Sequence, residues 1–305
     1  GCLFVVLLPK PDGGFRPIGL LPTIVRIWTR MRLHVARRWQ KDNERAYFYA
    51  GPMQSSTKAV WKQAALAETA RGAGAAYGIG MFDLQKAFER VPWDLLAVAA
   101  RESGYSLHLL RLSIAAYALD KTVTAIGACS RYVRAARGIT AGSAFATIEL
   151  RLLLLRSLDI VARAARTTTV TVYVDDVAIE AVGTAAMLAV HWFAAMRTLV
   201  ACFVALRLEF SGTKNTVIAA RSRVAHAAVA AMPEVALHAC LAGKSLGAGL
   251  GAGVRRWAYA ARKRIRAFAA RRGRLRMLNR SGVANSRLLR TGGVAAMSYG
   301  TPVIG

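Results

Sequence analysis

The sequence predicts an α+β fold, and three patterns along the chain carry this prediction. Residues 168–182 alternate apolar and polar side chains, which is typical of a β-hairpin. Residues 144–163 form a long apolar run at helical spacing and indicate a buried helix. Short strand patterns and helix patterns follow one another along the whole chain, with no internal repeat and no coiled-coil heptad. Strands and helices mixed in this order predict sheets packed against helices.

The remaining elements follow from apolar periodicity and from the turn residues between apolar runs. Residues 3–8 and 15–21 read as two strands joined by the turn Pro9–Gly14, and therefore as a small hairpin. Further strands are expected at 77–84, 206–210 and 215–219, with a weaker hairpin at 121–135. Helices are expected at 23–38, 57–71, 93–103, 106–119, 144–163, 184–205 and 254–272.

The chain carries a large positive charge. Its 305 residues include 43 Lys and Arg against 16 Asp and Glu, which gives a formal net charge of +27. Because 55% of the residues are apolar, the chain is not a disordered basic tail. The length allows one large domain or two to three subdomains with a sizeable core. The charge indicates a polyanionic partner such as nucleic acid or an anionic membrane surface, although codon usage in a GC-rich genome also favours Arg.

The charge is concentrated at the end of the chain. After Glu234 there is no acidic residue, while 14 Lys and Arg follow, so the last quarter alone carries +14. Thirteen of these fall within 255–290, with Trp257, Tyr259 and Phe268 among them. Basic side chains follow phosphates, and aromatic rings offer stacking faces. The segment is predicted to bind nucleic acid; a solvated helix face with three core aromatics is the alternative.

Several features bear on compartment and on metal chemistry. No uncharged run reaches the about 18 residues of a membrane helix, so no membrane partner is expected. The start GCLFVVLLPKP lacks Met and a basic n-region, which argues against a signal peptide and indicates an internal cut through a longer protein. Four cysteines and five histidines show no paired or metal-ligand spacing. We expect an intracellular, reducing location, nucleus or cytoplasm, and not secretion.

The few acidic residues cluster. Asp175 and Asp176 fall at the turn of the 168–182 hairpin, and Asp83 follows the apolar strand residues 77–82. If these strands pair, three carboxylates meet at one sheet edge, where they repel one another. A hard dication relieves this repulsion, and two Mg²⁺ ions about 3.5–4 Å apart clamp both oxygens of a phosphoryl transfer. Two turn aspartates can also be ordinary turn residues.

Five motifs follow in order along the chain: LLPKPDGGFRPIGLLPTIVRIW (7–28), FDLQKAFERVPWDLL (82–96), RGITAGSAFATIEL (137–150), VYVDDVAIEA (172–181) and LEFSGTKNTVIA (208–219). They resemble the fingers motif, the first palm motif, the Gly-containing motif, the catalytic hairpin and the lysine-bearing palm motif of reverse transcriptases of the non-LTR retrotransposon type. SLGAGLGAG (245–253) is a loose match to the primer-grip region. Because the motifs cover nearly the whole chain in the right order, coincidence is a poor explanation.

The resemblance implies a right-hand polymerase with an antiparallel-sheet palm, partial fingers and an α-helical basic thumb. The fingers would be residues 1–75, truncated at the N-terminus, and the palm residues 76–250 with a fingers-like insertion near 120–165. The thumb would be residues 251–305. The implied activity is RNA-directed DNA polymerisation as part of a retroelement, with an RNA template, a DNA primer and dNTPs as partners.

The resemblance also implies roles for single residues. Asp83, Asp175 and Asp176 match the carboxylates that hold two Mg²⁺ ions, with Mn²⁺ as a possible substitute, and the Leu84 backbone carbonyl would complete one coordination shell. Lys214 matches the lysine that protonates the pyrophosphate leaving group. The alternative for Lys214 is an ordinary surface lysine near a turn.

A second set of residues would bind the incoming nucleotide. Arg16 and Lys10 match residues that hold the triphosphate, and planar Arg grips phosphate oxygens bidentately. Phe88 matches the steric gate that excludes a ribose 2′-OH, and Gly142 the glycine that lets the template–nucleotide pair approach the backbone. Solvated loop charges and a core Phe are the alternatives. Binding of the template–primer backbone is expected from Arg255, Arg256, Arg262, Lys263, Arg264, Arg266, Arg271 and Arg272.

The sequence departs from the family at one contact. Ala141 stands where the family usually has Gln, and residues 143–146 lack the usual Pro, so grip on the nucleotide or fidelity would differ. The intact aspartates argue against long decay. Among enzymes, the alternative most similar in activity is a group II intron maturase or telomerase-like reverse transcriptase. An inactive nucleic-acid-binding remnant is an alternative from a different class of protein. A metal nuclease is a third alternative, but it would leave Phe88 and Arg16 without a role.

Overall fold

The computed structural model describes residues 2–10, 13–125, 127–164, 167–252 and 256–304. The chain divides into two compact units, each assembled from three stretches of sequence. Unit 1 comprises Gly1–Ala46, Leu84–Ala164 and Thr198–Ser211. Unit 2 comprises Tyr47–Asp83, Ala165–Arg197 and Gly212–Gly305. The mixture of sheets and helices confirms the predicted α+β class, and the division into fingers, palm and thumb stays a prediction.

Unit 1 contains a four-stranded sheet with the order β2-β1-β4-β5. Its strands are β1 (Cys2–Pro9), β2 (Phe15–Leu20), β4 (Asp120–Ala125) and β5 (Ala128–Cys129). The predicted β1–β2 hairpin is present, with Pro9 paired to Phe15, and β1 also pairs in parallel with β4. Leu3 of β1 packs with Leu21 and Ala116 in a small buried cluster, which holds the sheet against helix α5.

The helices of unit 1 are α1 (Thr23–Asp42), α3 (Ala87–Arg90), α4 (Trp93–Ser103), α5 (Leu107–Tyr117) and α6 (Ala146–Ala164). Helix α6 is buried on nearly all sides, because its apolar residues cover the whole circumference and not a single stripe. Helix α4 packs along it, and Ser106 caps the following helix α5 by accepting a hydrogen bond from the Leu109 N–H.

Unit 2 is built on a five-stranded sheet with the order β6-β7-β3-β8-β9. Its strands are β3 (Ala76–Phe82), β6 (Thr168–Tyr173), β7 (Asp176–Gly183), β8 (Asn215–Ala219) and β9 (Leu237–Cys240); β10 (Ala242–Ser245) and β11 (Ala248–Gly251) form a separate hairpin. All neighbours in the large sheet are antiparallel except β8 and β9. The pairing of the strand at 77–82 with the 168–182 hairpin, which was the condition for the carboxylates to meet, is therefore present.

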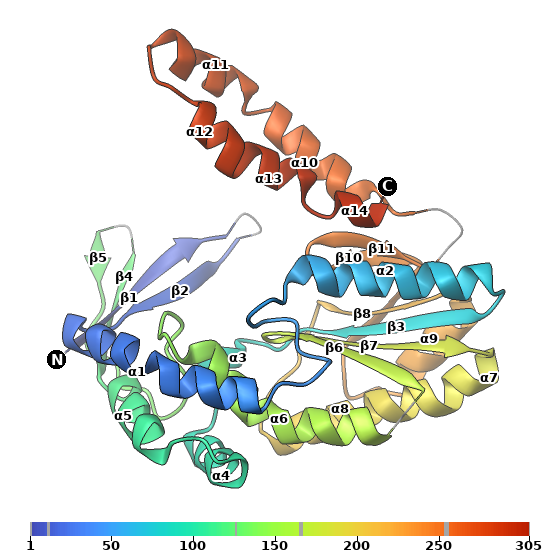
Figure 1. Cartoon of the computed structure of the whole chain (residues 1–305), viewed down its shortest axis with the longest axis horizontal. Helices are drawn as coiled ribbons and strands as arrows, with labels where there is room; N and C mark the ends of the chain where they lie inside the picture. Colours follow the sequence, from blue (N-terminus) through green and yellow to red (C-terminus); the bar gives the residue numbers. More distant parts are fainter. Residues whose placement is uncertain (1, 11–12, 126, 165–166, 253–255, 305) are drawn as a thin grey trace. The chain divides into compact units, whose positions relative to one another are not determined.

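Helices cover both faces of this sheet (Figure 1). Helix α2 (Ser56–Gly72) lies on one face, where small residues such as Ala64 and Ala67 allow close approach to Tyr77 and Ile79. The other face carries α7 (Ala185–Met187), the π-helical segment η1 (Leu188–Trp192) and α8 (Phe193–Ala205), the last of which ends in unit 1. A side-chain carbon on Gly78 would lie 2.6 Å from the Trp192 ring, so this strand position needs glycine.

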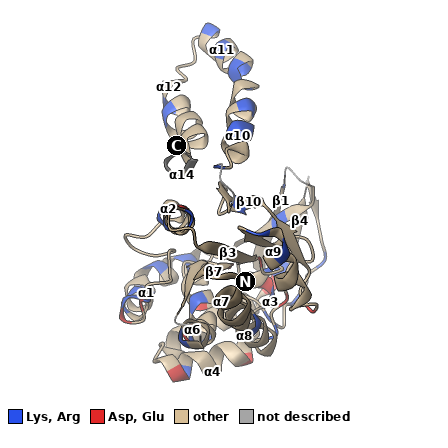
Figure 2. Cartoon of the chain, turned by 90° about the vertical axis from the view of Figure 1, so that its right-hand side faces the viewer, with Lys and Arg blue, Asp and Glu red and all other residues tan. Residues whose placement is uncertain are grey.

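Unit 2 ends in short helices, of which α10 and α11 carry most of the Lys and Arg (Figure 2). After α9 (Ser222–Ala230), these helices are α10 (Tyr259–Ala269), α11 (Arg272–Arg280), α12 (Ser286–Leu288), η2 (Leu289–Val294), α13 (Ala295–Ser298) and α14 (Thr301–Ile304). Helices α10 and α13 pack on each other. The Tyr299 hydroxyl donates to the Leu246 carbonyl, which ties this segment to the β10–β11 hairpin.

Two sequence predictions of secondary structure are wrong. Residues 206–210 form no strand, because the chain turns there with Arg207 at φ +58° and only Phe210 makes a bridge, to Leu84. The expected single helix at 254–272 begins at Tyr259 and is interrupted after Ala269. The apolar periodicity that predicted both elements carries no information about these local turns.

The helical stretch Ala185–Ala205 is long and apolar enough to cross a membrane by length and composition. Its apolar residues include Leu188, Trp192 and Met196, which are buried in this fold. A helix that covers one face of a sheet needs such a surface, so packing accounts for this buried part of its composition, while Val190 and Val204 are exposed.

Candidate active site

The three predicted carboxylates belong to the same end of the large sheet, where Asp83 and Asp176 line one pocket and Asp175 lies in the adjoining turn. Strand β3 pairs with β7 so that Phe82 lies opposite Val177, and the same register places Asp83 opposite Asp176. In the β6–β7 hairpin Tyr173 pairs with Asp176, which leaves Val174 and Asp175 as the two-residue turn. The sequence placed both aspartates at the turn; in the structure Asp175 lies in it and Asp176 is the first residue of β7.

The turn itself is strained. Val174 has φ +62°, a left-handed value that a β-branched residue rarely adopts. Such values cost of order 1–3 kcal/mol and persist where the surrounding fold imposes them, most often at functional sites. Pairing of β6 and β7 on both sides of the turn imposes it here, and the strain fixes the backbone that carries Asp175.

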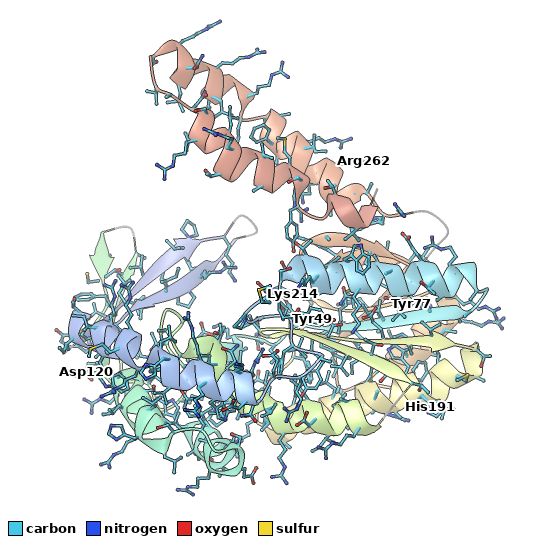
Figure 3. All side chains as sticks on the ribbon, viewed as in Figure 1. Tyr49, Tyr77, Asp120, His191, Lys214 and Arg262 are labelled. Atoms are coloured by element: carbon cyan, nitrogen blue, oxygen red, sulfur yellow. The ribbon has the colours of Figure 1, made fainter. Side chains whose placement is uncertain are left out.

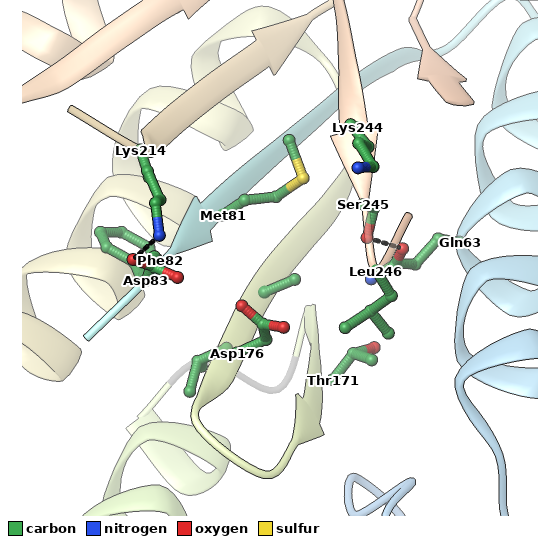
Figure 4. A pocket seen from close by; sticks show the side chains of 12 residues that line it. Gln63, Met81, Phe82, Asp83, Thr171, Asp176, Lys214, Lys244, Ser245 and Leu246 are labelled. Atoms are coloured by element: carbon green, nitrogen blue, oxygen red, sulfur yellow. Dashed lines mark hydrogen bonds and ion pairs between the residues drawn. The ribbon is translucent and has the colours of Figure 1, made fainter. Parts of the chain in front are cut away.

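A small pocket of about 150 Å³ lies beside Asp83 and Asp176 (Figure 4). Lys214 lines it as well, and its Nζ atom lies 3.4 Å from Asp83 Oδ2. Asn215, which is completely buried, accepts a hydrogen bond of 2.9 Å from the Asp83 backbone N–H. Strand β8 therefore fixes the Asp83 main chain through Asn215, while Lys214, one residue earlier, reaches the Asp83 side chain.

The carboxylates at the pocket lie close enough to raise the pKa of one of them. Desolvation by surrounding protein atoms, followed by the charges of Asp175 and Asp83, raises the pKa of Asp176 to about 7, and Lys214 offsets part of this. Asp176 is nevertheless an exposed residue, so its desolvation is only partial. The repulsion expected from the sequence is thus present, and it favours binding of a cation at these carboxylates.

Oxygen ligands and surplus negative charge fit a hard divalent cation. Within the part of the chain that the structure describes, no group of three His, Cys, Asp or Glu side chains is gathered tightly enough to hold a metal ion as it stands. The Lys214 ammonium group lies beside Asp83 and supplies positive charge there. Binding a metal ion would require the carboxylates to turn toward one another.

The opposite wall of the pocket contains residues that the sequence reasoning missed. Lys244, Ser245 and Leu246 come from β10 and the turn after it, and Gln63 comes from α2. The Ser245 hydroxyl donates to Gln63 Oε1 at 2.7 Å, so the hairpin and the helix are joined at the pocket. Lys244 is the first basic residue of the segment after Glu234 that contains no acidic residue, and this position could have marked it as a candidate site residue. Nothing in the sequence marks Gln63.

The predicted nucleotide-binding residues all belong to unit 1. Phe88 is half-buried on α3, and its backbone carbonyl accepts a hydrogen bond of 2.7 Å from the Ile139 N–H. The loop that follows Ile139 contains Gly142, so the first palm motif and the Gly-containing motif are bonded to each other. Lys10 and Arg16 are exposed at the tip and on the second strand of the β1–β2 hairpin.

The structure gives a reason of its own for glycine at position 142. Gly142 has φ +116°, and a side-chain carbon there would lie 2.5 Å from the Gly19 carbonyl oxygen. The Gly19 N–H in turn donates to the Ala141 carbonyl at 2.8 Å. Gly142 therefore lets the loop lie against β2. Its predicted contact with the template–nucleotide pair stays a prediction.

The remaining predicted residues are placed as follows. Leu84 is buried and bridges to Phe210, and metal binding by its carbonyl stays a prediction. Arg255 lies outside the described residues. Arg256 pairs with Glu68 of α2, and Arg264 donates to the carbonyls of Tyr299 and Gly247. Arg262, Lys263, Arg266, Arg271 and Arg272 are exposed, as is Arg256 despite its pairing with Glu68.

Asp83, Asp176 and Lys214 at one end of a mostly antiparallel sheet fit the palm of a nucleotidyl-transferring polymerase. The profile of the family "Reverse transcriptase (RNA-dependent DNA polymerase)" matches residues 8–230. The chain belongs to the reverse transcriptase family. No curated protein matches the sequence significantly.

Solved structures agree with this fold. The chain resembles apo telomerase from Candida tropicalis truncated from its C-terminal domain, with a TM-score of 0.53 and 10% identity over 82% of this chain and 53% of that one. It also resembles telomerase from Candida albicans in complex with a fragment of telomeric RNA, with a TM-score of 0.52 and 11% identity over 82% and 44% of the two chains. The chain spans about half the length of these proteins.

Proposed function

We propose that this chain is the catalytic part of an RNA-directed DNA polymerase of the non-LTR retrotransposon type. The observation that carries the proposal is the register of β3 and β7, which sets Asp83 opposite Asp176 beside the turn residue Asp175. In the proposed reaction the primer 3′-OH attacks the α-phosphate of a dNTP, and the bond between the α- and β-phosphates breaks with release of pyrophosphate. An RNA template would direct the choice of dNTP by base pairing.

Asp83, Asp175, Asp176 and the Leu84 carbonyl would hold two Mg²⁺ or Mn²⁺ ions. Bound there, the ions supply Lewis-acid activation of the primer hydroxyl and neutralise charge on the leaving pyrophosphate. Lys214 would give its proton to the pyrophosphate, and its 59% exposed side chain can leave Asp83 to do so. Arg16 and Lys10 would hold the triphosphate.

Selectivity in this proposal rests on unit 1 and on the basic end of the chain. Phe88 would exclude a ribose 2′-OH, and Gly142 would keep the nucleotide-facing loop close to β2. The exposed cations after Trp257 would follow the template–primer phosphates. The four cysteines are free in the described structure, in keeping with a reducing compartment.

The test is extension of oligo(dT) on poly(rA) with Mg²⁺. The Asp175→Asn, Asp176→Asn double variant removes both charges with little change of shape and should lose extension by several orders of magnitude. Asp42→Asn, an exposed carboxylate in unit 1, is the matched control and should extend as the wild type does. If the wild type extends the primer no better than the double variant does, the polymerase proposal is wrong, and the chain is instead a non-catalytic nucleic-acid-binding remnant.

Two further measurements separate the nearer alternatives. Strand cleavage without dNTPs would point to a nuclease. Repeated copying of one tightly bound RNA segment would point to a telomerase-like enzyme, whereas extension on any primed RNA favours the retrotransposon type.

A further inference from the structure

One face of helix α10 is cationic and aromatic, and the fold does not use it. Tyr259, Arg262, Lys263 and Arg266 are spaced three and four residues apart, so they share a face of the helix. All four are exposed (Figure 3 labels Arg262). With the residues just before the helix they line a groove of about 520 Å³. Its charged and aromatic lining consists of Arg256, Trp257, Tyr259, Arg262, Lys263 and Arg266.

The packing side of α10 is distinct from this face. Ala260 and Ala261 are buried, and Arg264 bonds inward to the Tyr299 carbonyl at 2.8 Å with its guanidinium over the Tyr299 ring. The fold is therefore held by one side of the helix. The α10 cations of the groove, Arg262, Lys263 and Arg266, are left on the other side, where they repel one another.

The aromatic part of the groove is fixed in place. The Trp257 backbone and ring lie directly on Gly249 of β11, in contact that a side chain at this glycine would block. Arg256 makes two hydrogen bonds, of 2.7 and 3.0 Å, to the Glu68 carboxylate of α2. Trp257 and Tyr259 lie 5.5 Å apart with an angle of 30° between their rings, and Tyr259 is 57% exposed. The groove thus presents a pre-organised aromatic surface beside three exposed cations.

The ligand must combine repeated negative charge with flat apolar faces. No acidic residue follows Glu234, so nothing in the last quarter of the sequence opposes an anion. A nucleic-acid duplex offers phosphates but keeps its base faces stacked inside, whereas an unpaired strand offers both phosphates and bases. A surface meant only for a duplex backbone would need cations and no ordered aromatic pair.

We propose that this groove is a binding site for single-stranded nucleic acid, with an unpaired base on Tyr259 and Trp257 and its flanking phosphates on Arg262, Lys263 and Arg266. This site refines the binding role proposed above for the exposed cations after Trp257 and rests on that part of the proposed function, but it does not depend on the polymerase reaction itself. A chain that extends no primer would still bind single strands here, so the two proposals fail independently.

The test compares a fluorescein-labelled ten-nucleotide oligo(dT) with a hairpin duplex of equal phosphate number, by anisotropy over a salt series. Tyr259→Ala should weaken binding of the single strand about tenfold and leave duplex binding unchanged, since one stacked base contributes on this scale. Tyr259→Phe keeps the ring and should restore binding. The Arg262→Ala, Arg266→Ala double variant should lower the salt slope for the single strand by about 1.4, at about 0.7 per phosphate contact.

The matched control is Arg274→Ala, Arg276→Ala on α11, which removes the same charge from exposed positions outside the groove. It should weaken single-strand and duplex binding to a similar, smaller extent. Photocrosslinking of 5-bromouridine-labelled strands gives a second measurement on the wild-type chain and should label Trp257 or Tyr259.

Three outcomes would overturn the proposal. Tyr259→Ala could bind single strands as the wild type does, or lose duplex and single strand equally. Crosslinks could fall only outside the groove. Vesicles of phosphatidylcholine with phosphatidylserine could displace the oligonucleotide from the wild type but not from Tyr259→Ala, which would make the groove a membrane surface.

Discussion

The Nζ atom of Lys214 lies 3.4 Å from an oxygen of Asp83, so a proposed proton donor is paired with a proposed metal ligand. The ammonium group and a metal ion would compete for the same carboxylate. Lys214 would then serve two states: it neutralises charge at Asp83 when no cation is bound, and it is freed for the leaving group when the cation binds.

The first prediction concerns removal of this ammonium group. Lys214→Met should bind Mn²⁺ several-fold more tightly in the absence of nucleotide, because a competing positive charge a few ångströms from Asp83 is gone. The same variant should extend primers about 10²- to 10⁴-fold more slowly, since a general acid is lost. Calorimetric Mn²⁺ titration and single-turnover extension measure the two effects.

The control is Lys244→Met, on the opposite wall of the pocket, which should leave the Mn²⁺ affinity closer to that of the wild type. Full extension activity in Lys214→Met would disprove the acid role.

The second prediction concerns the loop at Gly142. Gly142→Ala should destabilise unit 1 and raise the KM for dNTP, because the new carbon would meet the Gly19 carbonyl and push the loop from β2. Gly104→Ala is the matched control: Gly104 also has a positive φ, +71°, but nothing lies within 4 Å of a side-chain carbon there. The control should cost only about 1 kcal/mol of backbone strain. Urea unfolding of both variants tests this, and equal losses would show that the contact with Gly19 is unimportant.

These examples also separate what the sequence can predict from what it cannot. The meeting of Asp83 with Asp176 could be predicted only on the condition that the strand at 77–82 pairs with the 168–182 hairpin, because periodicity and a turn signal place each carboxylate at the end of a strand but do not determine which strands pair. The bond between Ser245 and Gln63 was not, because it joins residues 182 positions apart through the docking of a hairpin on a helix. The closeness of Gly142 and Gly19 is of the same kind.

Errors in the predicted elements have a local cause. Leu206, Leu208 and Phe210 alternate with other residues as a strand would, yet the Leu208 N–H bonds back to the Phe203 carbonyl of α8 at 3.0 Å. This bond closes a turn at the end of the helix, and Arg207 takes φ +58° within it. Apolar alternation over only five residues does not establish a strand, because the hydrogen bonds that end the preceding helix determine the conformation of these residues.

The third prediction concerns the strained turn. Val174→Gly should leave the free energy of unfolding unchanged or raise it slightly, because glycine adopts the positive φ without strain and this gain offsets its greater freedom in the unfolded chain. Extension should still slow, because the backbone that carries Asp175 is held less firmly. Thermal unfolding and steady-state extension measure the two effects.

A control for this variant lies two residues earlier, in strand β6. Val172 is buried, so Val172→Gly should lower stability by about 2–4 kcal/mol through lost packing. A comparable loss of stability in Val174→Gly would mean that the turn is not strained.

The fourth prediction concerns a buried carboxyl beneath the pocket. Glu180 is completely buried, Tyr77 donates to its Oε1 at 2.8 Å, and Thr171, which lines the pocket, donates to its Oε2 at 3.4 Å. Burial raises the pKa of Glu180 to about 7, and the two hydrogen bonds and the charge of Lys62 offset part of that shift. Because the unfolded value is about 4.3, the folded state holds a proton between about pH 4.3 and 7 that the unfolded state lacks. Stability from this group is therefore lost as the pH rises through that window.

Glu180→Gln keeps an acceptor for Tyr77 and removes the titration. The variant should gain stability relative to the wild type between pH 5 and pH 8, by up to about 3 kcal/mol at the upper end. Urea unfolding at several pH values measures the difference. Tyr77→Phe removes a hydrogen bond that lowers the Glu180 pKa, so its stability should keep falling to a higher pH than that of the wild type. Parallel pH profiles for the wild type and Glu180→Gln would mean that Glu180 has the same charge in the folded and unfolded states.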